Sequence, residues 1–170
     1  QIKKIRPDLN CKIIRGNVDT RIKKLNEGTY HAIILSYAGI KYLDFENEVS
    51  EIFSAEQIIP SAGQGIIALQ CRKDDHETIS ILKKINHNDT YKRAHVERDI
   101  LKVLEGDCET AVGVISEINN ENITLQGELF SLDGKERFYY KSTKDIKQAA
   151  ELGTEIGENL KKQSKGSYKK

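Results

Sequence analysis

The second half of the chain carries helix and strand patterns in an order that few folds can accommodate. Apolar residues recur at intervals of three and four over residues 90–104, which predicts an amphipathic helix, and Gly106 is expected to end it in the left-handed conformation. Three strand patterns joined by hairpin turns follow, at residues 110–117, 123–131 and 137–142. A last amphipathic helix, weakened by Gly153 and Gly157, is expected over residues 145–163. This order predicts an α+β domain, a small three-stranded antiparallel sheet covered by helices.

The first half of the chain shows an alternation that is typical of a parallel α/β unit. The expected elements are a strand at residues 11–14, a helix at 19–27, a strand at 31–35 and a helix at 37–43. The run at 31–35 is continuously apolar, as in a strand buried on both faces. A further strand is expected at 66–71, after a glycine-rich turn, and a further helix at 75–85. The sequence thus predicts a partial α/β domain ahead of the α+β domain.

Charge and hydropathy argue against several classes of function. The chain has 27 basic and 26 acidic residues, a net charge of +1, which is not typical of a nucleic-acid-binding protein. The locally basic stretch 161–170 is expected to be a frayed, solvated end. No apolar run approaches the about 20 residues that a membrane span needs. Three cysteines without a secretory leader favour a cytoplasmic protein without a structural disulfide.

Two arginines, Arg15 and Arg21, flank the start of the helix predicted at residues 19–27. The free backbone N–H groups and the positive dipole end of a helix favour an anion at this position. Guanidinium groups add bidentate recognition of carboxylates. The sequence therefore predicts a carboxylate site, and the alternative is a solvated helix end in which these arginines pair with acids such as Asp19.

The lone thiol of Cys108 follows the predicted helix end and is expected to lie on a loop. A lone cysteine is most often a small buried hydrophobe, whereas an accessible thiolate attacks electrophiles. Cys11 and Cys71 fall in strand patterns and are expected to pack. No zinc site is expected, because the cysteines do not have a metal-ligand spacing with His76, His87 or His95.

Two polar motifs receive no chemical role from the sequence. Gly63-Gln64-Gly65 is too short for a phosphate-cradling loop and lacks the lysine of such loops, so its glycines are expected to allow a tight interdomain crossing. Glu97 and Arg98 are adjacent within the helix predicted at residues 90–104. They are expected to provide surface or interdomain electrostatics.

The order and spacing of these segments resemble those of the porphobilinogen deaminase (hydroxymethylbilane synthase) family. The matching segments are the junction from Arg15 to Arg21, Ala38-Gly39-Ile40-Lys41, Gly63-Gln64-Gly65 followed by Cys71-Arg72, Glu97-Arg98, and Leu104-Glu105-Gly106-Asp107-Cys108. The resemblance extends to about residue 134. It implies a transferase of haem and tetrapyrrole biosynthesis that condenses porphobilinogen into hydroxymethylbilane with release of ammonia.

The resemblance also implies roles for individual residues. Cys108 would carry a dipyrromethane cofactor through a thioether, and Arg15 and Arg21 would bind carboxylates of the cofactor and of the substrate. This sequence departs from the family pattern at Tyr42, Asp107 and Ala111, where arginine, glycine and proline are usual. No anion-binding role is therefore transferred to Tyr42.

The family's domain organisation implies boundaries for this chain. Residues 1–57 would be the second half of a periplasmic-binding-protein-like α/β domain, 58–78 a crossover segment that belongs to a missing first domain, and 79–170 the C-terminal α+β domain with the cofactor cysteine. The chain has no methionine and no residue that matches the family's catalytic aspartate, so it is expected to be an inactive fragment. The parent would be monomeric, and the fragment would self-associate through exposed interdomain surfaces.

Two other classes of function remain compatible with these residues. In a non-enzymatic binding module, the junction with Arg15 and Arg21 would hold a small carboxylate and Cys108 would be structural. In a thiol-dependent enzyme, Cys108 would act as a nucleophile beside His95, although no third group orients such a pair. Replacement of Cys108 by serine discriminates between these hypotheses.

Overall fold

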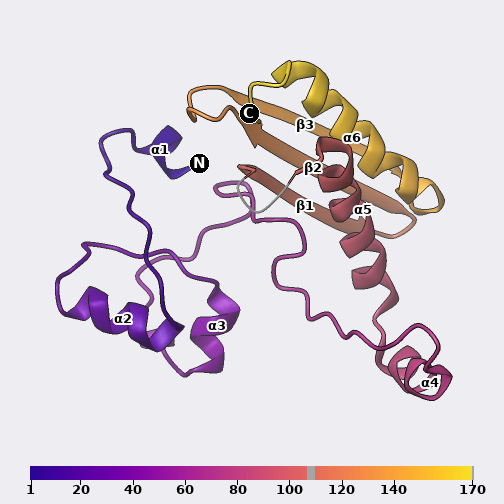
Figure 1. Cartoon of the computed structure of the whole chain (residues 1–170), viewed down its shortest axis with the longest axis horizontal. Helices are drawn as coiled ribbons and strands as arrows, with labels where there is room; N and C mark the ends of the chain where they lie inside the picture. The colour runs from indigo at the N-terminus through magenta and orange to yellow at the C-terminus, as the bar shows by residue number, and fades with distance from the viewer. Residues whose placement is uncertain (107–109, 170) are drawn as a thin grey trace. The chain divides into compact units, whose positions relative to one another are not determined.

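The computed structural model describes residues 1–106 and 110–169, which fall into two compact units (Figure 1). The first unit is Gln1–Ile58 and the second is Ile59–Lys170. Within the described part of the chain, no helix is long and apolar enough to cross a membrane.

The second unit is built on an antiparallel sheet in the order β1-β2-β3. Its elements are α4 (His76–Ile85), α5 (Asn88–Leu104), β1 (Val112–Asn119), β2 (Asn122–Phe130), β3 (Arg137–Asp145), the 3-10 turn η2 (Ile146–Gln148) and α6 (Ala149–Ser164). Adjacent strands are joined by short turns, and α5 and α6 run across one face of the sheet (Figure 1). The predicted three-stranded antiparallel sheet with covering helices is confirmed.

The core of this unit lies between the sheet and the two long helices. Alternate residues of β2 face the helices, and the largest fully buried apolar side chains are those of Ile100, Leu104, Ile123, Leu125, Leu129, Leu152, Ile156 and Leu160. Gly127 lies among them on β2, where a Cβ atom would come within 3.0 Å of Leu160 Cδ1 and 3.1 Å of Ile156 Cγ2. The helices therefore rest directly on the strand backbone at this point.

Close packing of α5 against α6 explains the two glycines of the last helix. A Cβ atom on Gly153 would lie 2.6 Å from the backbone oxygen of Val96 and 2.8 Å from Asp99 Cβ. A Cβ atom on Gly157 would lie 2.7 Å from Val103 Cβ. Both glycines lower the helix propensity of α6, but they allow its backbone to approach α5.

Replacing Gly153 by alanine is expected to lower the free energy of unfolding by about 1–3 kcal/mol, because the added methyl group forces the helices apart. The better helix propensity of alanine offsets at most about 1 kcal/mol of this loss. Urea denaturation of the variant tests the effect. Thr154→Ala, at an exposed neighbouring position of α6, is the matched control and should leave the midpoint almost unchanged. An unchanged or raised midpoint for Gly153→Ala would contradict the packing argument.

The first unit contains short helices without a sheet. They are α1 (Ile2–Ile5), α2 (Val18–Asn26), α3 (Tyr37–Tyr42) and the 3-10 turn η1 (Glu46–Glu48). The helices predicted at 19–27 and 37–43 are confirmed as α2 and α3, and each buries one isoleucine, Ile22 and Ile40 respectively.

The strands predicted at residues 11–14 and 31–35 do not form. Residues 1–58 are all described and contain no strand, and Ile13 is 81% exposed. The prediction of a strand at 66–71 is also wrong for this chain, since Ile67 is 90% exposed and the segment pairs with no strand of the described sheet. Apolar runs of strand length become strands only when a neighbouring strand accepts their backbone hydrogen bonds.

Candidate functional site

The junction that precedes α2 has a backbone that requires glycine. Gly16 has a φ angle of +123°, in the region that disfavours side chains, and a Cβ atom there would lie 3.0 Å from Thr20 Cγ2. Asn17 is the N-cap of α2, but its side chain accepts no capping hydrogen bond. The N–H groups of the first turn of α2 therefore remain available to an anion.

Both predicted arginines belong to this junction. The Nε atom of Arg21 donates to the backbone oxygen of Gly16 at 2.7 Å, which leaves its terminal nitrogens for another acceptor. The guanidinium of Arg15 is exposed and has no acceptor within the described part of the chain, while its backbone oxygen accepts from Lys24 Nζ at 3.0 Å. Asp19 contacts Thr20 Oγ1 at 3.5 Å, and no described contact joins it to either arginine. The guanidinium of Arg15 and the terminal nitrogens of Arg21 are cationic donors of the kind that bind carboxylates.

Helix α5 ends in a turn at Glu105 and Gly106, and Cys108 follows two residues later in the sequence. The amide of Glu105 donates to Lys102 O at 3.1 Å and that of Gly106 to Leu101 O at 2.9 Å, the hydrogen-bond pattern of a Schellman motif. The left-handed residue is Glu105, with a φ angle of 53°, so the prediction that Gly106 takes this conformation is wrong. Cys108 itself lies outside the described residues.

Residues near the end of the chain hold this turn. Tyr168 is 2% exposed, and its hydroxyl donates to Leu104 O at 2.9 Å. Lys169 Nζ donates to Glu105 Oε2 at 2.8 Å, and Lys161 Nζ donates to Val103 O at 3.2 Å. The hydrogen bond from Lys169 and the charge of Lys161 lower the pKa of the Glu105 carboxyl from its ordinary value. The prediction that the basic stretch 161–170 is frayed and solvated is therefore wrong for its described residues.

Glu97, for which the sequence predicted surface or interdomain electrostatics, is buried within the second unit. The residue is 3% exposed. Its Oε1 atom accepts from the amide of Ser116 at 3.0 Å and from the hydroxyl of the same serine at 2.6 Å. Oε2 accepts from the amide of Gly63 at 2.8 Å, and nearby Val114 N donates to Pro60 O at 2.7 Å. Glu97 thus attaches the glycine-rich turn to α5 and β1. The signal for burial was its spacing, three residues before Ile100 within the apolar stripe of the helix.

The other cysteines and the metal-binding groups contribute no further site. Cys11 is exposed rather than packed, because the strand predicted around it does not form, and Cys71 is half-buried. Among the described His, Cys, Asp and Glu side chains, no group of three or more is placed to hold a metal ion.

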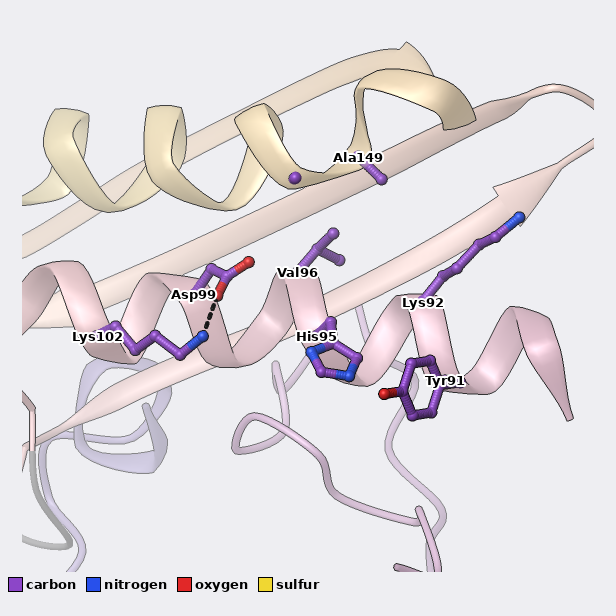
Figure 2. A pocket seen from close by; sticks show the side chains of 8 residues that line it. Tyr91, Lys92, His95, Val96, Asp99, Lys102 and Ala149 are labelled. Atoms are coloured by element: carbon purple, nitrogen blue, oxygen red, sulfur yellow. Dashed lines mark hydrogen bonds and ion pairs between the residues drawn. The ribbon is translucent and has the colours of Figure 1, made fainter. Parts of the chain in front are cut away.

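A surface hollow of about 380 Å³ lies between α5 and α6 (Figure 2). Its lining residues are Tyr91, Lys92, His95, Val96, Asp99, Lys102, Ala149 and Ala150. The rings of Tyr91 and His95 are 4.3 Å apart, and Lys102 Nζ pairs with Asp99 Oδ1 at 2.6 Å (Figure 2). The hollow contains neither Arg15 nor Arg21, and of its charged groups Asp99 and Lys102 pair with each other.

Comparison with known proteins gives the same family over both halves of the chain. Residues 1–80 match the family model of the porphobilinogen deaminase dipyromethane cofactor binding domain, and residues 91–162 match that of the porphobilinogen deaminase C-terminal domain. A porphobilinogen deaminase of Trichlorobacter lovleyi is 40% identical over 160 residues, which cover 94% of this chain and 51% of the relative. One of Brevibacillus brevis is 39% identical over 167 residues, which cover 98% of this chain and 53% of the relative.

The chain spans about half the length of the curated relatives that it matches. The two family models cover consecutive parts of the chain and describe domains of one enzyme family, so the resemblance inferred from the motifs is confirmed. The chain belongs to the porphobilinogen deaminase family.

Proposed function

We propose that the chain is the part of a hydroxymethylbilane synthase that anchors the cofactor and binds carboxylates. The whole enzyme would condense porphobilinogen into hydroxymethylbilane with release of ammonia, in tetrapyrrole and haem biosynthesis. The observation that carries this proposal is the donor set at Arg15, Arg21 and the start of α2, within a segment that matches a dipyromethane cofactor binding domain.

The residues at this junction suit a dipyrromethane group, whose acetate and propionate side chains are anionic. Arg15 offers an exposed guanidinium without a described acceptor, and Arg21 is held by Gly16 in a fixed position. The open N–H groups of α2 add donors that require no side-chain ordering. Arg15 and Arg21 would thereby orient cofactor and substrate carboxylates.

Cys108 is the proposed attachment residue, through a thioether. It lies in the segment matched by the C-terminal domain of the family, four residues after the end of α5 at Leu104. When bound, the dipyrromethane would supply the pyrrole carbon on which the product chain grows. The role of the protein at this position would be to present a thiol at the end of a rigid helix.

The same proposal covers the domain organisation. Residues 1–57 would complete a periplasmic-binding-protein-like α/β domain, 58–78 would cross to a first domain outside this chain, and 79–170 would form the C-terminal domain. The exposed side chains of Ile13, Ile34 and Ile67 support this arrangement. They lie in apolar runs of strand length that pair with no strand in the described part of the chain. The isolated chain would be inactive and prone to self-association, whereas the whole enzyme would be a cytoplasmic monomer.

The test is the intact mass of the purified chain, followed by peptide mapping across Cys108. A mass gain equal to a dipyrromethane group on Cys108 is the expected result for a chain produced with porphobilinogen and the rest of the enzyme. A different adduct on Cys108 would favour a thiol-dependent enzyme. A free thiol under these conditions would overturn the proposed anchoring role.

A further inference from the structure

Strand β1 lies at one edge of the sheet, so half of its backbone groups point away from β2 (Figure 1). The amide of Phe130 donates to Ala111 O at 3.0 Å, and this bond sets the alternation along the antiparallel pair. The N–H groups that point to the open edge are therefore those of Val112, Val114, Ser116 and Ile118. Such an edge is a template for a strand from another molecule.

Two acceptors occupy the middle of this edge. The amide of Val114 donates to Pro60 O at 2.7 Å, and the amide of Ser116 donates to Glu97 Oε1 at 3.0 Å. The other carboxylate oxygen of Glu97 accepts from the amide of Gly63 at 2.8 Å. We call residues 59–63 the covering segment. Glu97 thus has two roles, because it is an acceptor for β1 and it also holds the covering segment against this strand.

The covering segment packs closely on the backbone of β1. Ile59 is 4% exposed, and a Cβ atom on Gly113 would lie 2.8 Å from its backbone oxygen. Ala62 packs against the hydrophobic core of the second unit. A side chain at Gly113 would displace the segment, so glycine at this position of the strand allows the close contact.

The two edges of the sheet are protected in different ways. Strand β3, at the other edge, has exposed Arg137 and Lys141, and charged side chains on an edge strand oppose pairing with further strands. Residues 112–118 of β1 contain a single charged side chain, that of Glu117. An apolar run of high strand propensity and low charge, without proline, readily pairs with copies of itself. Strand β1 therefore lacks the protection that β3 has in its own side chains.

We propose that Glu97 and the covering segment close the edge of β1 against a second copy of this chain. When the edge opens, the amides of Val114 and Ser116 lose their acceptors, and an antiparallel β1 strand of a second copy supplies new ones in a two-fold symmetric pair. All the contacts lie within the second unit. The proposal does not depend on the assigned function or on any cofactor.

Hydrogen exchange of the wild-type chain gives a test that needs no variant. It is measured at a dilution at which sedimentation shows a monomer, so that no second copy protects the edge. The amides of Val114 and Ser116 should exchange within about tenfold of those of Ile115 and Glu117, which bond to β2. Fast exchange at both outward amides would mean that the edge is open, and it would overturn the proposal.

The variant Glu97→Ala opens the edge. Its association constant, from sedimentation equilibrium, should rise at least about tenfold over wild type, because the freed amides gain acceptors in a second copy. Gly157→Ala is the destabilised control, since it disturbs the contact of α6 with Val103 and leaves both acceptors of β1 in place. Its association constant should equal that of wild type.

A lysine on β1 distinguishes strand pairing from general aggregation. In the Glu97→Ala background, Ile115→Lys adds a charge to the edge strand and should return the association constant to the wild-type value. Thr143→Lys, at an exposed position of β3, is the matched control and should not. Association that survives Ile115→Lys would overturn the proposal, as would a constant for Glu97→Ala no higher than that for Gly157→Ala. Association through the apolar runs of the first unit is common to all these variants and forms the baseline.

Discussion

Replacing Glu97 by alanine is expected to lower the free energy of unfolding of the second unit by about 3 kcal/mol or more, because hydrogen bonds to a charged group contribute about 1.5–3 kcal/mol each. The change leaves the buried amide of Ser116 and the partly buried amide of Gly63 without their acceptor. Urea denaturation followed by circular dichroism measures the loss. Glu158→Ala, on the exposed side of α6 and without a described ion pair, is the matched control and should have little effect.

The variant Glu97→Gln distinguishes the hydrogen bonds to Ser116 from the hydrogen bond to Gly63. The amide oxygen of glutamine can still accept from Ser116, but its NH₂ group then faces the Gly63 amide, and two donors cannot pair. The glutamine variant should therefore recover only part of the stability, and hydrogen exchange at Gly63 should stay fast. Wild-type stability in either variant would mean that Glu97 does not attach the turn.

Replacing Cys108 by serine is expected to abolish attachment of the dipyrromethane group completely. A serine hydroxyl is a far weaker nucleophile than a thiolate near neutral pH, so no covalent bond should form. Intact mass of wild type and variant, both produced with porphobilinogen and the rest of the enzyme, gives the result. The serine variant should show the mass of the bare polypeptide.

Cys11→Ser is the control for this experiment, since Cys11 is exposed and its loss should leave the adduct in place. An adduct that persists in the Cys108→Ser variant would place the attachment residue elsewhere. Retention of small-carboxylate binding together with the absence of any adduct in wild type would instead favour the non-enzymatic binding module.

Local patterns predicted the helices and the sheet of the second unit. The apolar stripe of α5 and the short turns between β1, β2 and β3 act over a few residues, so they are readable without tertiary contacts. The strands predicted at 11–14 and 31–35 failed for the opposite reason. Apolar composition gave these runs a strand pattern, but a ladder needs a second backbone, and the described structure provides none for them.

The contacts around the candidate site were less predictable than its residue types. Arg15 and Arg21 were identified from their place around the start of a helix, and the structure has both at the junction that opens α2. Glu97 bonds to an amide 34 residues earlier, and Tyr168 to a carbonyl group 64 residues earlier. Partners so far apart in sequence leave no periodic signal, so the hydrogen-bond partners of Glu97 and Tyr168 required coordinates.

The hydrogen bond from Tyr168 to Leu104 also sets an order of events during biosynthesis. A ribosome releases the chain from its N-terminus, so Leu104 emerges 64 residues before its partner. The strands β1, β2 and β3 have their pairing partners earlier, because the last of them ends at Asp145. The contact between Lys169 and Glu105 therefore forms only after 64 further residues have been translated.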